Sequence, residues 1–395
     1  MVSAIISARA GNTTLLLEKL PNIASKLKAT GGGRCNLTNT LSNEDFMKSF
    51  GRDGRFMQDA LNTFNHKELI KFLDEIGVAT HAPDGFRVFP TSHSSATIIS
   101  ALENEIVKLG VTLLCSQKVI EITHNENQIT GVKTETSNFL APNVIVATGG
   151  LGYPTLGAEG DGYKMAIELG HKVTELFPAM MPLQTKENWG ANCRADTIPK
   201  VEIKIDMKKH KKLRAKGDLI FTKNGIRGPV VLDFAREITP LLEKYGELPL
   251  LLNLIKGLNE EQISQHIKKE VSKNPENSIV NIVSTLLPLA LSNELCLLAD
   301  INPNDKHNKI DGASRAKLIQ LLAWTPLTIN GHDGFKMAMI TRGGINLKEI
   351  DPKTMQSKLV KGLYFCGEVM NLDGPCGGYN LQWSFASGVL AGRLF

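Results

Sequence analysis

The first residues of the chain alternate between helix, turn and strand patterns. Residues 2–10 are small and tolerated in helices, and Gly11 is a suitable helix end. Residues 13–17 form an apolar run that predicts a buried strand, which is followed by Glu18 and Lys19. Helix, tight turn, apolar strand and terminal acid make up the second half of a mononucleotide-binding unit, in which the acid bonds a ribose hydroxyl.

The first half of such a unit would lie upstream of this sequence. Its glycine-rich turn is about 20 residues before the acid, a position that precedes Met1. We therefore expect the first strand and its GxGxxG turn to be absent from this sequence. Either the true start lies upstream, or the chain is a truncated form with impaired cofactor binding.

Beyond this region the chain separates into blocks of different periodicity. Residues 94–109 have the pattern of an amphipathic helix, and 143–148 that of a buried strand that runs into a glycine turn. Between them the alternation predicts one meander, with strands at 111–114, 119–123 and 128–134. The pattern therefore predicts an α/β fold in which ligands gather at the carboxyl ends of strands.

Composition places the chain among globular proteins. Its 395 residues are 42% hydrophobic and 22% charged, which excludes a disordered chain, a collagen-like chain and a small disulfide scaffold. The most apolar stretch, 279–299, contains Pro288 and Glu294. A membrane span needs about 20 mostly apolar residues, so we expect a buried helix there and no membrane partner.

The cysteines point to a reducing compartment. None of the six belongs to a CxxC pair or to a group with metal-ligand spacing, so we expect no metal site. With no signal peptide evident in the sequence, this usage predicts a cytoplasmic protein.

One segment of the chain is strongly basic. Residues 208–214 contain four lysines and one arginine between two strand-like stretches. A solvated hairpin is one interpretation and a site for an anionic partner is the other. Because the formal net charge is only +5 over the whole length, we do not expect nucleic acid as a partner.

Glycine-dense turns carry the candidate chemistry. Three glycines at 31–33 allow backbone N–H groups to approach a ligand, Arg34 offers a planar donor fork, and Asn36 adds a short polar side chain. A flexible polar loop is the alternative. Asp161 precedes a predicted helix and is interpreted as its cap rather than as a ligand contact.

Five segments together resemble the HI0933-like flavoproteins, also called the BaiN/YhiN-like or aminoacetone-oxidase family. They are TGGGRCNLTN at 30–39, ATGG at 147–150, GDLIFTKNGIRGP at 217–229, TRGG at 341–344 and GLYFCGEVMNLDGPCGGYNLQW at 362–383. The resemblance covers essentially the whole chain. This sequence departs from the family at Asn371, where an aspartate is usual, and in lacking the amino-terminal GxGxxG.

The resemblance implies a Rossmann-like FAD-binding domain of the two-dinucleotide-binding-domain type, built from both chain ends. The implied domains are 1–179 with 334–395 for FAD, a β-rich insert at 180–254 with 324–333, and a helical subdomain at 255–323. Glu18 would hold the adenosine ribose and Glu368 the ribityl hydroxyls. The residues placed along FAD are Glu18, Lys19, Gly32, Gly33, Arg34, Cys35, Asn36, Val119, Thr148, Gly149, Gly150, Gly367, Glu368, Gly378, Tyr379, Asn380 and Leu381.

The start of the last predicted helix has its own physical argument. A helix amino terminus presents free N–H groups and about half a positive charge. Aimed at the flavin, it would stabilise the anionic reduced form; a structural turn with a cap is the alternative. Trp383 and Phe385, within this helix, are predicted to belong to the core.

By this resemblance the protein is an FAD-dependent oxidoreductase that moves a hydride to or from flavin N5. NAD(P)H is a possible electron donor, amine oxidation is a possible direction, and the substrate is an unidentified small molecule. No catalytic acid or base is assigned, and the oligomeric state is open. The alternative is a flavin-binding or sensing protein without turnover.

Overall fold

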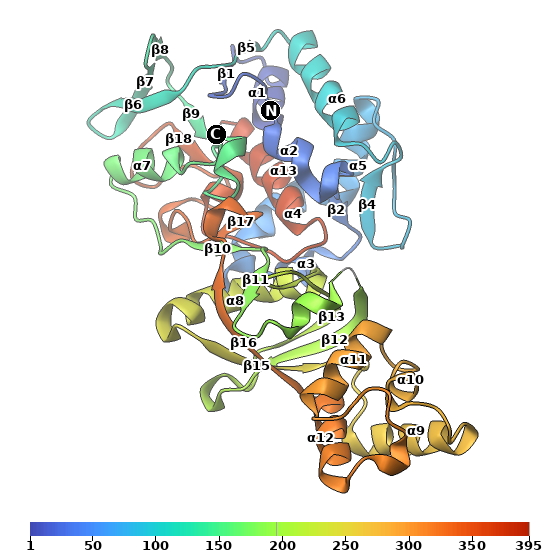
Figure 1. Cartoon of the computed structure of the whole chain (residues 1–395). Coiled ribbons are helices and arrows are strands. Elements are labelled where there is room, and N and C mark those ends of the chain that lie inside the picture. The colour runs from blue at the N-terminus through green and yellow to red at the C-terminus, as the bar shows by residue number, and fades with distance from the viewer. Residues whose placement is uncertain (195, 395) are drawn as a thin grey trace. The chain divides into compact units, whose positions relative to one another are not determined.

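The computed structural model describes residues 1–194 and 196–394. The chain forms two compact units. Unit 1 comprises Met1–Pro178 and Met339–Phe395, and unit 2 comprises Ala179–Ala338 (Figure 1). Both chain ends thus lie in unit 1, whereas unit 2 is one continuous insertion. The predicted division of that insertion into two domains remains a prediction.

Unit 1 contains two parallel strand pairs. β1 (Leu15–Leu17) pairs with β5 (Thr112–Leu114), and β9 (Val144–Val146) pairs with β18 (Leu363–Phe365). β5 was predicted as a meander strand, and that prediction is wrong. β5 follows the long helix α6 (Ser95–Lys108), so the connection returns it parallel to β1.

The meander itself has a different third strand. It contains β6 (Val119–Asn125), β7 (Gln128–Thr134) and the short β8 (Asn138–Leu140) in antiparallel order. A second antiparallel sheet has the order β2 (Thr38–Asn39), β4 (Arg87–Pro90), β3 (Thr80–His81). This small sheet places Thr38 and Asn39 beside the start of the last helix.

The helices of unit 1 cover these strands. They are α1 (Val2–Arg9), α2 (Ser25–Ala29), α3 (Asn43–Lys48), α4 (Gln58–Thr63), α5 (His66–Glu75), α6, α7 (Asp161–Glu168) and α13 (Tyr379–Gly392). The predicted first and last helices are therefore confirmed. Where the chain passes from unit 1 to unit 2 and back, β10 (Phe177–Ala179) pairs with β17 (Ile340–Arg342).

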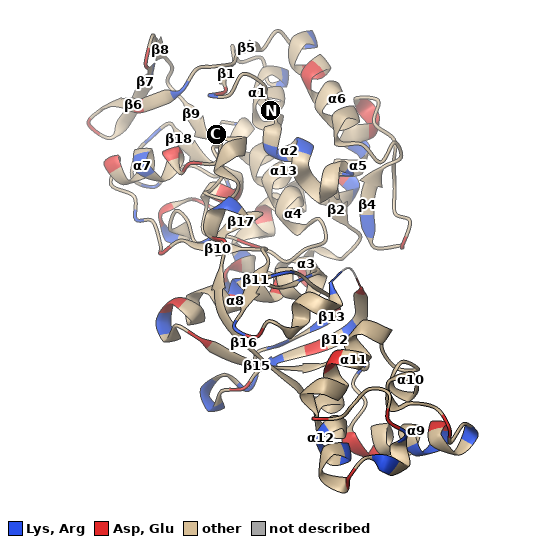
Figure 2. Cartoon of the chain, in the orientation of Figure 1, with Lys and Arg blue, Asp and Glu red and all other residues tan. Residues whose placement is uncertain are grey.

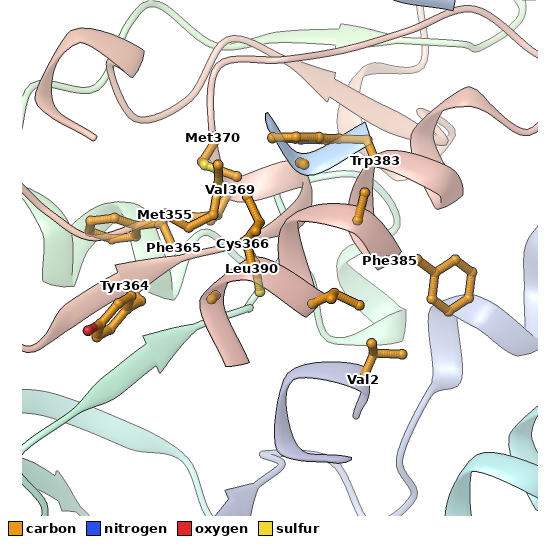
Figure 3. Packing of buried hydrophobic residues seen from close by; sticks show 14 of the residues in the cluster. Val2, Met355, Tyr364, Phe365, Cys366, Val369, Met370, Trp383, Phe385 and Leu390 are labelled. Atoms are coloured by element: carbon orange, nitrogen blue, oxygen red, sulfur yellow. The ribbon is translucent and has the colours of Figure 1, made fainter. Parts of the chain in front are cut away.

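Helix α13 lies in the middle of the core of unit 1. Its residues Trp383 and Phe385 are buried, as predicted, and it packs against α1 and β18. Figure 3 shows apolar side chains from these elements and from neighbouring segments gathered together, including Val2 of α1 and Cys366, which follows β18. Burying a large aromatic or aliphatic side chain contributes roughly 1.5–3 kcal/mol to the stability of the fold. The buried residues of α13 therefore hold its first turn in place.

Unit 2 contains a closed six-stranded barrel. Its strand order is β11 (Leu183–Thr185), β14 (Gly225–Arg227), β13 (Arg214–Phe221), β12 (Thr197–Ile205), β15 (Leu248–Asn253) and β16 (Thr325–His332). Apolar residues of alternate positions fill the interior, and α8 (Pro229–Tyr245) packs against β13. Closure leaves no free sheet edge.

Four helices follow β15. They are α9 (Glu260–Lys273), α10 (Ile279–Val283), α11 (Leu289–Leu298) and α12 (Gly312–Ala323). The single buried helix predicted over 279–299 is in fact two helices, because Pro288 lacks an N–H and precedes α11. No helix of residues 1–194 and 196–394 is long and apolar enough to cross a membrane.

Candidate functional site

Two glycine-rich segments that are distant in sequence are hydrogen bonded at the start of α13. The side-chain amide of Asn36 donates to the carbonyl of Thr38 at 3.1 Å and accepts from the N–H of Gly378 at 3.2 Å. The amide of Asn39 donates to the carbonyl of Gly377 at 2.9 Å. Hydrogen bonds from Asn36 and Asn39 therefore join the loop after α2 to the turn before α13.

This close approach depends on Gly378. Its φ of +83° is unfavourable for residues with a side chain, and a Cβ would lie 2.5 Å from the carbonyl carbon of Thr38. In the loop after α2, Gly31 and Gly32 also have positive φ values, +61° and +65°. Both of these glycines are exposed, so their backbone groups are accessible to a ligand.

Glu368 follows β18 and has both carboxylate oxygens engaged. The N–H of Thr341 donates to Oε1 at 2.9 Å, and the ammonium of Lys26 donates to Oε2 at 2.7 Å. The Glu368 side chain keeps 16% of its surface exposed. Because each carboxylate oxygen can accept more than one hydrogen bond, Glu368 can also accept from a ligand hydroxyl.

The glycine turn after β9 lies directly against this carboxylate. A Cβ on Gly150 would be 2.3 Å from Oγ1 of Thr341 and 2.7 Å from Oε1 of Glu368. The same Thr341 hydroxyl oxygen accepts from the N–H of Leu151 at 2.7 Å. Thr148 is exposed at the carboxyl end of β9, where open α/β sheets bind their ligands.

A second group of residues lies at the end of β1. The Glu18 carboxylate accepts from the N–H of Leu20 at 2.9 Å, so it already forms a local turn. The Lys19 ammonium pairs with Asp161 at 2.6 Å and Glu159 at 2.9 Å. Burial opposes the charged ammonium, but these two hydrogen bonds outweigh burial and raise the pKa of Lys19.

The prediction that Asp161 caps a helix is wrong. Helix α7 begins at Asp161, its cap residue is Gly160, and no side-chain cap bond forms. The carboxylate instead pairs with Lys19 and lies 3.7 Å from Lys118. Gly160 takes a φ of +79° that an aspartate would adopt at a cost, so glycine occupies the cap and frees the acid for the ion pair.

The other predicted site residues are distributed around these two groups. Asn380 bonds the backbone of Gly374 in both directions, at 2.8 and 2.9 Å, and so closes the turn before α13. Gly367 donates to Oγ of Ser387 at 2.9 Å. Arg34 and Thr148 are exposed, Val119, Gly33, Gly149 and Leu381 are half-buried, and Cys35 and Tyr379 are buried.

The buried position of Cys35 argues against a role as a redox thiol. Burial raises the pKa of Cys35 to about 12, so the reactive thiolate is not populated at neutral pH. Its φ of +59° shows that it turns the loop between Gly33 and Asn36. A packing role follows from both observations.

Sequence reasoning missed two residues that hold Glu368. Lys26 lies only four residues before Thr30, but a lysine in a short helix gives no signal for an ion pair to a residue near the other end of the chain. Thr341 was part of the TRGG segment, yet its hydrogen bonds to Glu368 and Leu151 depend on the β10–β17 pairing. Only tertiary structure brings these residues together.

A serine, a histidine and an acid also line up elsewhere in unit 1. His171 contacts Oγ of Ser357 at 2.8 Å through Nε2 and Oε2 of Glu349 at 3.2 Å through Nδ1. The Ser357 oxygen accepts from the N–H groups of Leu359 and Val360 at 3.0 and 2.9 Å, and Ser357 is 6% exposed. Because this hydroxyl is buried and its oxygen already accepts two backbone hydrogen bonds, we assign Ser357 a structural role and not that of a nucleophile.

The residues fit a dinucleotide cofactor. Open space beside Gly32 and Gly149, where an added Cβ would meet no atom within 4 Å, is the decisive observation, since it leaves room for a ligand close to the backbone. Exposed Thr148 and the largely buried Glu368 add polar groups just after the paired strands β9 and β18. In the described residues no cluster of three or more His, Cys, Asp or Glu is placed to hold a metal ion.

Comparison with known proteins identifies relatives over the full length. A family model described as the HI0933-like protein Rossmann domain matches residues 1–394. A 3-dehydro-bile acid delta(4,6)-reductase of Clostridium scindens is 29% identical, covering 100% of this chain and 95% of the relative. A ribosomal RNA dihydrouridine synthase of Escherichia coli is 28% identical, covering 98% and 93%.

Solved structures share the fold at low sequence identity. A 3-ketosteroid delta1-dehydrogenase of Sterolibacterium denitrificans has a TM-score of 0.54 at 10% identity, covering 99% of this chain and 96% of that one. A 3-ketosteroid-delta4-(5alpha)-dehydrogenase of Rhodococcus jostii has a TM-score of 0.51 at 15% identity, covering 99% and 92%. The predicted Rossmann-like fold class is confirmed.

Proposed function

Because the chain belongs to the HI0933-like family of Rossmann-domain proteins and is an FAD-dependent oxidoreductase, we propose that it adds two hydrogens across a carbon–carbon double bond conjugated with a carbonyl group. The observation that carries this proposal is the reaction type of the full-length relatives. One is named as a delta(4,6)-reductase of a 3-dehydro-bile acid, and another as a synthase of dihydrouridine. Both names describe saturation of such a bond, in unrelated molecules.

In this proposal the two residue groups of unit 1 hold opposite ends of FAD. Glu18 accepts from the adenosine ribose, Thr148 lies along the adenosine half, and Glu368 accepts from the ribityl hydroxyls. Lys26 acts through Glu368, because its ammonium holds one carboxylate oxygen at 2.7 Å. When bound, FAD supplies the hydride.

The first turn of α13 supplies electrostatic stabilisation. This helix has 14 residues and begins at Tyr379, after two glycines with positive φ. Its amino terminus carries about half a positive charge. Placed near the flavin, that charge favours the reduced form, which is the form that a reductase must accumulate before it meets its substrate.

NAD(P)H is proposed as the electron donor and a small conjugated carbonyl compound as the acceptor. Reduction of the double bond needs a hydride for the carbon distant from the carbonyl and a proton for the carbon next to it. The amine-oxidising alternative runs electrons in the other direction, from substrate to flavin. The two alternatives therefore predict opposite effects of substrate on flavin colour.

The test uses purified, flavin-loaded protein under anaerobic conditions. NADH or NADPH is added until the yellow flavin absorbance bleaches, and then a 3-keto bile acid with 4,6 double bonds, or uridine, is mixed in. The proposal predicts return of the yellow colour with a product heavier by two hydrogens. An amine donor serves as the comparison.

Three outcomes decide the question. Reoxidation only by conjugated carbonyl compounds supports the proposal. Bleaching of oxidised flavin by an amine, without any response to conjugated carbonyl compounds, overturns it in favour of amine oxidation. Flavin that no donor reduces, even though it stays bound, supports the sensing alternative.

A further inference from the structure

We propose that the outward face of the β12–β13 hairpin in unit 2 binds the phosphodiester backbone of a nucleic acid strand. Residues 200–218 contain eight lysines and arginines against three carboxylates, a formal charge of +5. The whole chain also has a formal charge of +5, so the remaining residues are balanced in sign. The excess charge of the molecule is therefore concentrated in a single hairpin, which Figure 2 colours along β12 and β13.

Strand alternation places the charges that lie within β12 and β13 on one face. The register pairs Lys204 with Arg214 and Glu202 with Lys216, and directly paired residues share a face of the sheet. The intervening residues Val201, Ile203 and Ile205 are buried in the barrel. The apolar interior thus forces the basic residues outward.

The carboxylates of this hairpin leave most of its positive charge uncompensated. Glu202 lies 3.0 Å from the ammonium of Lys216 and 3.5 Å from the guanidinium of Arg214. Asp218 accepts from the backbone N–H of Lys200 at 3.1 Å. Both cationic side chains paired with Glu202 remain more than half exposed, at 69% and 60%.

One end of this face is hollowed. A depression of about 350 Å³ is lined by Lys200, Glu202, Lys216, Gly217, Lys256 and Gly257. Lys200 and Lys256 hold φ values of +56° and +60°, strained backbone conformations of a kind that clusters at functional sites. Three ammonium groups around a small hollow suit a phosphate group.

Aromatic rings accompany the charges. The Lys204 ammonium lies 3.5 Å from the centre of the half-buried Trp324 ring. At the hairpin tip, the His210 ring lies 5.8 Å from Tyr245, which is 37% exposed. Basic side chains interleaved with aromatic rings are the usual composition of surfaces that bind nucleic acid strands.

The face does not have the composition of a membrane-binding surface. A basic membrane surface places large apolar side chains among its lysines. Within the described residues of 190–220, no large hydrophobic side chain is exposed, and Met207 and Leu213 pack against the barrel core. The formal charge of the whole chain gives no expectation of nucleic acid as a partner, whereas the same charge gathered on one hairpin supports this proposal.

The inference rests on the charges of unit 2 and not on the proposed reaction, so each can fail alone. With a rise of about 3.3 Å per residue, a strand from Lys200 to Lys208 spans roughly 26 Å, the length of about seven phosphates. Each phosphate contact contributes about −0.7 to the slope of log affinity against log salt for a single strand. A face of this size predicts a slope near −5.

The experiment measures fluorescence anisotropy of a labelled single-stranded RNA, with flavin-loaded full-length protein, over a series of salt concentrations. The variant is K211E/K212E at the hairpin tip. The control is K268E/K269E, which makes the same charge change at two exposed lysines on α9. We expect roughly tenfold weaker binding and a slope shallower by about 1.4 for the tip variant, with little change for the control.

A third variant, K200Q/K256Q, tests the hollow without reversing charge and should also weaken binding. Equal losses for the tip variant and the α9 control would overturn the inference, since only net charge would then matter. So would an absence of RNA binding at low salt, or tighter binding to vesicles of anionic lipid than to RNA. A DNA strand of the same sequence shows whether the sugar contributes, and flavin absorbance confirms that every variant is folded.

Discussion

Replacing Gly378 with alanine perturbs the point where two glycine-rich segments meet. The new Cβ would lie 2.5 Å from the carbonyl carbon of Thr38 and 2.6 Å from its Cα and oxygen. These are backbone atoms, so no side-chain rotation relieves the contact, and the β2 strand or the α13 turn must move. The φ of +83° adds a conformational cost that glycine does not have.

The expected magnitude follows from two contributions. An alanine in the left-handed region costs about 1–2 kcal/mol, and overpacking of a tight contact costs about 1–3 kcal/mol more. Gly378→Ala should therefore lower the free energy of unfolding by about 2–5 kcal/mol. Gly11→Ala is the matched control, because Gly11 has a φ of +87° with no atom within 4 Å of the added Cβ.

The assay compares urea unfolding and the ratio of flavin to protein in the two variants. Gly11→Ala should lose only about 1–2 kcal/mol and keep its flavin. Gly378→Ala should lose more stability and retain less flavin. If both variants lose the same stability and both keep their flavin, the turn before α13 is not part of the cofactor site and the reasoning is refuted.

The remaining predictions concern four side chains. Lys26→Met should weaken flavin retention, because Glu368 loses a partner at 2.7 Å; Lys28→Met, on the same short helix, is the control, and equal retention in both would argue against a positioning role. Burial lowers the pKa of His171, although Glu349 opposes the effect. Below about pH 6.5 the unfolded chain therefore binds a proton at His171 that the folded chain does not bind. The contribution of neutral His171 to the free energy of unfolding should be fully present above that pH and should fall as the pH drops further. Urea unfolding at several pH values should show this fall, and a weaker fall in His171→Asn; an unchanged profile contradicts it. Cys35, with its pKa raised to about 12 by burial, should react with iodoacetamide much more slowly than the half-buried Cys115 when peptides are quantified by mass spectrometry. Lys19→Met should leave Asp161 without its nearest cation and raise the pKa of that carboxyl, which NMR titration would detect.

Local patterns in the sequence predicted much of unit 1. The first helix, the strand before Glu18 and the last helix depend on short-range periodicity and capping, and these elements are confirmed. The prediction that the strand is buried is wrong, because Leu15 is exposed and Leu16 and Leu17 are half-buried. The meander prediction failed at 112–114, because alternation marks a strand without telling which strand it pairs with. Likewise, Asp161 looked like a cap until the structure placed Lys19 next to it.

The parts of the candidate site that depend on distant contacts could not be predicted. Glu368 was expected from its motif, but its partners Lys26 and Thr341 come from other segments of the fold. The basic hairpin was recognised as a run of charge, yet only the register showed that Lys204, Arg214 and Lys216 share one face. The sequence alone does not tell which side of a sheet a charged side chain faces; the pairing of the strands does.

Hydrogen–deuterium exchange with and without added FAD tests the central claim most directly. If separated glycine-rich turns converge on one cofactor, FAD should slow exchange together in three segments, 30–39, 147–150 and 362–383, while the hairpin at 200–218 stays unchanged. Protection confined to one of these segments, or spread evenly over the chain, would contradict the account.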